Sequence, residues 1–98
     1  MTSQEAIAIL VANREALRAR GVRHAALFGS VARGEARPES DLDILIDLEP
    51  DAKLGIFEYV GIRQFIADLL AGSVDVVDRA ALKPHVRPSA ESEAISAF

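Results

Sequence analysis

The chain has 98 residues, of which half are hydrophobic and 27% are charged, and its formal net charge is −4. This balance excludes a disordered chain and predicts one globular domain over residues 1–98, while the absence of cysteine excludes disulfides, thiolate metal sites and a thiol nucleophile. No apolar run approaches the roughly 20 residues of a membrane span, so we expect a cytoplasmic protein without a membrane segment. A net acidic chain with scattered arginines lacks the basic face that long nucleic acids require, so we expect no direct binding of long DNA or RNA.

The predicted elements begin with an amphipathic helix that occupies the first twenty residues. Thr2 and Glu5 have the spacing of a capping box, apolar residues then recur on one helical stripe, and Gly21 is typical of the residue that follows a helix. The segment Val22–Phe28 is short, apolar and bounded by glycines, so it is predicted to be the first strand.

A turn at Gly29-Ser30 leads into a predicted short helix from Val31 to about Glu35, followed by a loop over 36–40. The segment Leu42–Leu48 then shows the sharpest alternation in the chain and predicts the second strand. One predicted face carries Leu42, Ile44, Ile46 and Leu48, and the other carries Asp41, Asp43, Leu45 and Asp47.

The apolar positions of Leu54–Leu70 fall mostly on one helical face, and Gly72 is expected to end this helix. The apolar side of the helix, which includes Phe57, is richer than a domain of this size needs for its core. It is therefore the best candidate for a partner surface. A third, short strand is predicted at Val74–Val77.

Asp78 is placed to cap a further helix that runs to about His85, and the structure of Ser89–Phe98 is left open. The resulting order of helix, strand, short helix, strand, helix, strand and helix predicts an α/β fold with a sheet of three strands or slightly more. The short connection between the first two strands does not by itself decide their relative direction.

Asp41 and Asp43 are the first candidates for chemistry. Residues two apart on a strand point to the same side, with Cα atoms roughly 6.5–7 Å apart. Two carboxylates on one face repel each other, and a divalent cation removes that conflict. Oxygen ligands favour Mg²⁺, which readily takes phosphate oxygens as further ligands. An isolated pair of this kind is more often a solvated strand face.

Ten residues lie between the turn Gly29-Ser30 and this pair. Glycine allows the backbone to turn closely there, and amide groups with a serine hydroxyl can hold phosphate oxygens. A lone Gly-Ser is usually a plain turn with a serine cap. In combination with Asp41 and Asp43, and with apolar strands on both sides, the spacing becomes specific.

The stretch Gly29–Ile46, with sequence GSVARGEARPESDLDILI, resembles the signature of the DNA polymerase β-like nucleotidyltransferases. It takes the form of the minimal, single-domain group that is often found as the antitoxin of HEPN-domain proteins. The resemblance is tight over Leu27–Leu48 and extends in element order from about Ala6 to Val86. It implies the nucleotidyltransferase fold, with a small mixed sheet and flanking helices.

The resemblance also implies a third carboxylate on a later strand, and Asp75 is the position that matches. Asp78 lies close by, and a shift of one residue in register would exchange the faces of this strand. Asp75 is preferred as the third carboxylate, and Asp78 is interpreted as the helix cap.

The implied mechanism is two-metal transfer of a nucleoside monophosphate, with ATP as the expected donor and two Mg²⁺ ions. Asp41 and Asp43 would bind the ion that clamps the triphosphate, and together with Asp75 they would hold a second ion at the acceptor hydroxyl. Gly29 and Ser30 would hold the β and γ phosphates. Asp75 could also accept the hydroxyl proton.

Two arginines between these motifs are further candidates. Arg33 and Arg37 could each neutralise phosphate charge, although an arginine in an acidic protein more often pairs with a carboxylate. The ion pair is favoured for Arg37, and both interpretations stay open for Arg33, which is kept as a phosphate-binding candidate.

Two functions therefore compete. In the first, the chain is a protein adenylyltransferase that transfers AMP to a hydroxyl of a HEPN-domain toxin and thereby acts as its antitoxin. In the second, it is a non-catalytic nucleotide-binding module that neutralises such a partner by occlusion. A plain acidic α/β domain would need the motif spacing to be chance. The modest core also allows a homo-oligomer.

Overall fold

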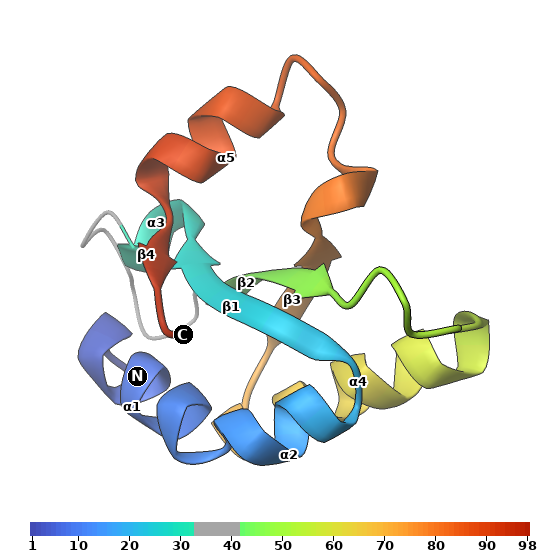
Figure 1. Ribbon diagram of the computed structural model, residues 1–98. Helices are drawn as coiled ribbons and strands as arrows, with labels where there is room; N and C mark the ends of the chain where they lie inside the picture. Colours follow the sequence, from blue (N-terminus) through green and yellow to red (C-terminus); the bar gives the residue numbers. More distant parts are fainter. Residues whose placement is uncertain (33–41) are drawn as a thin grey trace.

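The computed structural model describes residues 1–32 and 42–98 (Figure 1). Its elements in chain order are α1 (Ser3–Ala12), α2 (Arg14–Ala19), β1 (Val22–Phe28), α3 (Gly29–Ala32), β2 (Leu42–Leu48), α4 (Ile56–Leu70), β3 (Val74–Asp78), a 3₁₀ turn η1 (Arg79–Ala81), α5 (Arg87–Glu93) and β4 (Ile95–Ser96). None of the helices in the described part of the chain is long and apolar enough to cross a bilayer.

The strands form one mixed sheet in the order β3-β2-β1-β4. β1 runs antiparallel to both β2 and β4, whereas β2 and β3 are parallel and are joined through α4. The antiparallel β1–β2 pair settles the strand direction that the connecting segment left open. The predicted α/β fold with a small mixed sheet is thus confirmed, and its four strands agree with the prediction of three strands or slightly more.

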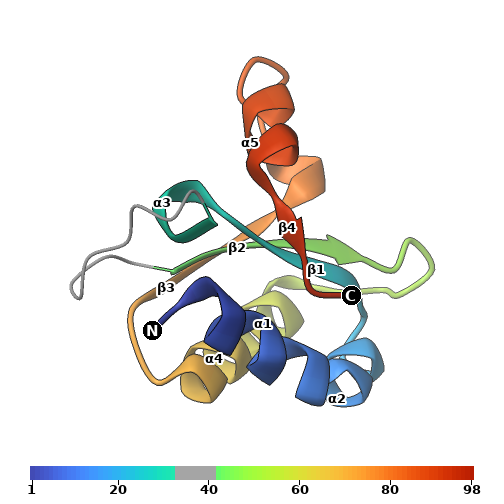
Figure 2. The same ribbon diagram turned by 90° about the vertical axis from the view of Figure 1, so that its left-hand side faces the viewer.

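Helices cover both faces of this sheet (Figure 2). α1, α2 and α4 lie against one face, where they enclose the main hydrophobic core with the strand residues Leu42, Ile44 and Ile46. The helices contribute the buried side chains Ala6, Leu10, Leu17, Ile62, Ile66 and Leu70. α3 and α5 lie over the opposite face, where Leu45 is buried. The alternation of side-chain faces predicted for β2 therefore holds from Leu42 onward.

The N-terminal helix begins as predicted but is interrupted. The Thr2 hydroxyl accepts a hydrogen bond from the Glu5 amide at 3.1 Å, and the Thr2 amide donates to the Glu5 carboxylate at 3.4 Å, which completes the capping box. The predicted single helix is instead two, because the Asn13 side chain donates to the Ile9 carbonyl at 2.8 Å and the helix breaks there. Gly21 has a φ of +100°, as expected of the residue after a helix.

α4 starts and ends within two residues of its prediction. The Gly55 amide, just before the helix, donates to the Glu58 carboxylate at 3.0 Å and so satisfies one amide at its N-terminus. Gly72 was expected to end the helix, but the residue in the left-handed conformation is Ala71, with a φ of +52°. The helix therefore stops at a residue that is not well suited to that conformation.

The chain after β3 departs most from prediction. The Asp78 carboxylate accepts a hydrogen bond from the Ala80 amide at 3.0 Å, as expected of a cap. The capped element is only the three-residue turn η1, however, and the helix predicted to reach about His85 is absent, since the backbone before Pro84 disfavours a helix. The segment Ser89–Phe98 contributes to α5 and forms β4.

Candidate active site

The pairing of β2 with β3 brings Asp43 and Asp75 directly side by side. In a parallel pair, residues in register point to the same face, and neighbouring strands lie about 4.8 Å apart. Asp43 is half-buried, whereas Asp75 is exposed on the outer strand of the sheet. One half-buried and one exposed carboxylate therefore lie next to each other near the N-terminal ends of β2 and β3.

The register also separates Asp75 from Asp78. Asp78 lies opposite Ile46, three positions farther along the strand, and its carboxylate is engaged by the Ala80 amide. The structure thus places Asp75, and not Asp78, beside Asp43, in agreement with the preferred assignment.

Gly29 brings the turn between β1 and α3 against the same carboxylate. Phe28, the last residue of β1, lies opposite Asp43. Gly29 follows with a φ of +78°, and a Cβ atom built on it would overlap the Asp43 carboxylate, with the carboxylate carbon only 3.0 Å away. A residue with a side chain would meet both backbone strain and this overlap, so the close approach depends on glycine.

Several predicted site residues lie outside the described part of the structure. Asp41, Arg33 and Arg37 fall in residues 33–41, and Ser30 is described only through its backbone in α3. The roles expected for the Asp41 carboxylate, the Ser30 hydroxyl and the two arginines remain predictions.

The described residues suit a divalent cation with phosphate ligands. Two adjacent carboxylates supply the oxygen ligands that Mg²⁺ prefers, and Gly29, which has no side chain, lets the backbone turn approach the Asp43 carboxylate closely. Within residues 1–32 and 42–98 no group of three potential ligands gathers, and the predicted ligand Asp41 lies outside this part of the chain.

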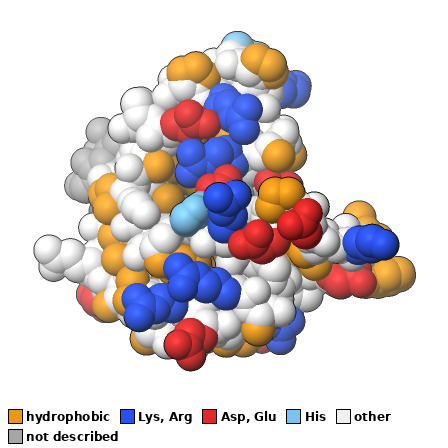
Figure 3. Space-filling view, in the orientation of Figure 1, with side chains coloured by type: hydrophobic (Ala, Val, Ile, Leu, Met, Phe, Trp, Pro, Cys, Tyr) orange, Lys and Arg blue, Asp and Glu red, His pale blue; other side chains and the backbone are white. Residues whose placement is uncertain are grey.

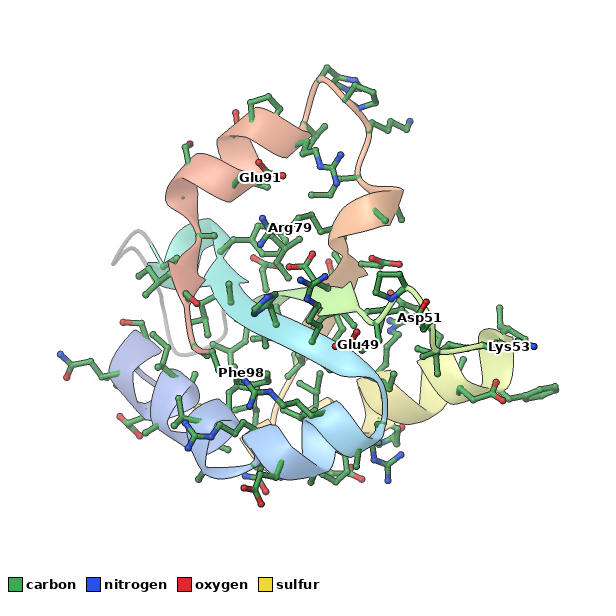
Figure 4. All side chains as sticks on the ribbon, in the orientation of Figure 1. Glu49, Asp51, Lys53, Arg79, Glu91 and Phe98 are labelled. Atoms are coloured by element: carbon green, nitrogen blue, oxygen red, sulfur yellow. The ribbon has the colours of Figure 1, made fainter. Side chains whose placement is uncertain are left out.

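Asp47, on the same strand face as Asp43, forms an ion pair. Its carboxylate lies 3.0 Å from Arg79 Nε, and Arg79 in turn lies 3.8 Å from the carboxylate of Glu91 in α5 (Figure 4). The geometry at Arg79 Nε is that of an ion pair rather than an aligned hydrogen bond. Sequence reasoning missed these ion pairs because α5, which carries Glu91, was not predicted, and because the pairing of β2 with β3, which brings Arg79 to Asp47, has no local signal in the sequence.

A groove of about 490 Å³ lies beside this ion pair, at the opposite end of β2 from Asp43. Arg23 and Arg87 line it together with Asp47 and Glu49. Basic and acidic side chains are correspondingly interleaved on this face of the molecule (Figure 3). Such a mixed surface lacks the continuous positive charge that binds a phosphate backbone.

Comparison with known proteins agrees with this geometry. Residues 12–97 match the sequence profile of the nucleotidyltransferase domain family. The chain is also 35% identical over 96 residues to the protein adenylyltransferase MntA of Thermococcus cleftensis, and the alignment covers 97% of this chain and 95% of that relative.

Solved structures give the same result for the fold. One that is provisionally named a minimal nucleotidyltransferase superposes with a TM-score of 0.72 at 34% identity, over 97% of this chain and 95% of that one. A complex of a tri-AMPylated Shewanella oneidensis HEPN toxin with its MNT antitoxin contains a chain with a TM-score of 0.64 at 18% identity, over 94% and 71% of the two chains. Matches of this length and identity show that the chain belongs to the nucleotidyltransferase domain family.

Proposed function

We propose that this chain is an Mg²⁺-dependent protein adenylyltransferase that transfers AMP from ATP to a hydroxyl of a HEPN-domain toxin, and that the transfer neutralises the toxin. The observation that carries the proposal is the register that sets Asp43 beside Asp75 under the turn at Gly29. The activity named for the Thermococcus cleftensis relative and the AMPylated toxin in the Shewanella oneidensis complex support this acceptor class.

Asp41, Asp43 and Asp75 are the residues that would hold the metal. When bound, Mg²⁺ neutralises the charge of the triphosphate and of the pyrophosphate that leaves. Asp43 is half-buried and its carboxylate lies against the turn at Gly29, where it would help to fix the position of the donor.

Gly29, Ser30 and Arg33 form the proposed phosphate-binding side of the site. Gly29 carries no side chain, so the phosphates can approach the backbone turn as closely as the Asp43 carboxylate does. The Ser30 hydroxyl and the Arg33 guanidinium would bind phosphate oxygens and align the α-phosphorus for attack.

Asp75 faces the acceptor in this proposal. It is exposed on an outer strand, so a hydroxyl on a large protein can reach it, whereas Asp43 is less accessible. The acceptor oxygen bonds to the α-phosphorus of ATP, the bond to the bridging oxygen breaks, and pyrophosphate leaves. In this proposal Asp75 would accept the hydroxyl proton.

The test is a transfer assay on a purified HEPN-domain toxin, with MgATP and detection by intact-protein mass spectrometry. The wild-type chain should add AMP to that protein, and Asp43→Asn should not. Should the wild-type chain neutralise the toxin without any gain of AMP, and should Asp43→Asn neutralise it equally well, occlusion would replace transfer as the function.

A further inference from the structure

The first turns of α4 present an apolar surface that the fold does not cover. Ile56, Phe57 and Val60 are 73%, 87% and 53% exposed. They make up half of the six large hydrophobic side chains that are exposed in residues 1–32 and 42–98, although they lie within five consecutive positions. We refer to these three residues as the α4 patch.

The α4 patch lies at a projecting corner of the molecule, next to the loop that carries Lys53 (Figures 3 and 4). A groove of about 460 Å³ borders it on the α2 side and includes Arg20, Phe57 and Glu58 in its lining. A second groove of about 430 Å³ borders it on the β3 side and includes Ile56. Leu54 lines both grooves, so the patch is an apolar projection between two hollows.

The size of the α4 patch suits the centre of a protein interface. Since a fully exposed aromatic side chain offers about 200 Å² and an aliphatic one somewhat less, the three exposed fractions amount to roughly 400 Å². A standard interface buries about 800 Å² on each partner, with a polar rim around an apolar centre. The patch would supply about half of that area, and the groove walls would supply the rim.

The charges at the rim favour a second copy of this chain. The groove next to Phe57 carries one cation, Arg20, and one carboxylate, Glu58. Arg20 stacks on the Phe65 ring at 4.4 Å and has no carboxylate partner among the described residues. In a twofold dimer every contact between two different residues occurs twice, once in each direction. Arg20 of each copy can therefore face Glu58 of the other copy. A second copy offers an opposite charge to each of the two groups, whereas a partner surface of a single charge sign would be attracted by one and repelled by the other.

We propose that the α4 patch binds the same patch of a second copy, so that Phe57 of each copy enters the groove of the other in a twofold dimer. The α4 patch lies at the end of β2 that carries Leu48, since Leu48 lines the same groove as Ile56. Five residues of strand separate Leu48 from Asp43, or roughly 17 Å. The dimer therefore leaves the carboxylates of both copies open, and it does not depend on the proposed activity.

Sedimentation velocity on the full chain, over roughly a hundredfold range of concentration, tests the proposal. The wild-type chain should shift from monomer to dimer, and Phe57→Asp should weaken dimerisation at least ~10-fold, because each copy would bury a carboxylate at the centre of the interface. The matched control is Val86→Asp, which places the same charge on a 41% exposed side chain outside the patch and should dimerise as wild type does. Thermal melts verify that both variants are folded.

A charge exchange tests the twofold arrangement itself. Arg20→Glu alone places like charges together twice and should be monomeric, and Glu58→Lys alone should be monomeric for the same reason. A mixture of these two variants should form heterodimers, because every contact is then between opposite charges. A wild-type chain that stays monomeric, a dimer that Phe57→Asp leaves intact, or a monomer whose patch binds only the HEPN-domain protein would overturn the proposal.

Discussion

Replacing Gly29 with alanine should damage nucleotide binding more than folding. The substitution puts a side chain at a φ of +78°, which costs an L-residue about 1–2 kcal/mol. The new Cβ also overlaps the Asp43 carboxylate, since the carboxylate carbon lies 3.0 Å from the Cβ position and ordinary contacts begin near 3.4 Å. The carboxylate has to move, and a displacement of about 1 Å in a reacting group can cost roughly 100-fold in rate.

Thermal unfolding with and without MgATP measures both effects. A ligand at about 100 times its Kd stabilises a protein by about 2.7 kcal/mol, and a tenfold loss of affinity removes about 1.4 kcal/mol of this. Gly29→Ala should lower the melting temperature without ligand by about 4–8 °C for each kcal/mol of strain, and a tenfold loss of affinity should also remove about half of the shift that MgATP produces in the wild type.

Gly21→Ala is the matched control, because Gly21 has a comparable φ of +100° and its added Cβ would press only on the flexible end of the Leu54 side chain, while Ala52 Cβ lies at an ordinary contact distance of 3.6 Å. It should lower the melting temperature to a similar degree but retain the full shift with MgATP. If the two variants lose the ligand shift equally, or if Gly29→Ala keeps it, the close approach of Gly29 to Asp43 has no role in nucleotide binding.

Three further predictions concern the two ends of α4 and the strand beside it. Asp75→Asn should bind MgATP nearly as wild type does but transfer AMP at least ~100-fold more slowly, which corresponds to about 2.7 kcal/mol in the activation barrier. Asp78→Asn should lose only about 1 kcal/mol of stability from its cap, and the reverse result in the transfer assay would show that the assignment of Asp75 is wrong. Ala71→Gly should raise the free energy of unfolding by about 1 kcal/mol in urea titrations, because it relieves the left-handed backbone; no gain would mean that this conformation is not strained. Tyr59→Phe should lower it by about 1 kcal/mol, since it removes the hydrogen bond of 3.1 Å that the Tyr59 hydroxyl donates to the Val76 carbonyl, and unchanged stability would show that this bond contributes nothing.

The elements with strong local signals could be predicted from the sequence. β2 was predictable because each alternate side chain enters the core, so the burial pattern is written in the sequence itself. The capping box at Thr2 and Glu5 was predictable because it needs only a spacing of three residues.

The elements that depend on contacts between distant parts of the chain could not be predicted from the sequence. β4 has only two residues, and its pairing of Ile95 with Leu27 joins segments that lie far apart in the chain. The ion pair of Asp47 with Arg79 likewise exists only because β2 and β3 are neighbours. Residue spacing carries no information about either contact.

The candidate site divides in the same way. Asp43 and Gly29 were found from the motif, and their direct contact is a result of the antiparallel register of β1 and β2. The choice of Asp75 over Asp78 came from the family resemblance, because a strand of five residues with an aspartate near each end has no periodicity that fixes its face. Only the pairing with β2 distinguishes them.

The position of Asp75 on an outer strand has a consequence for how the protein stays in solution. An outer strand offers unpaired backbone groups to other chains, and β3 is otherwise rich in valine, a combination that favours aggregation. The Tyr59 hydroxyl occupies one carbonyl of β3, and the negative charge of Asp75 repels the same strand of another molecule. Neutralising Asp75 would remove that repulsion, so a variant made to abolish transfer would also be the one most prone to edge-to-edge assembly.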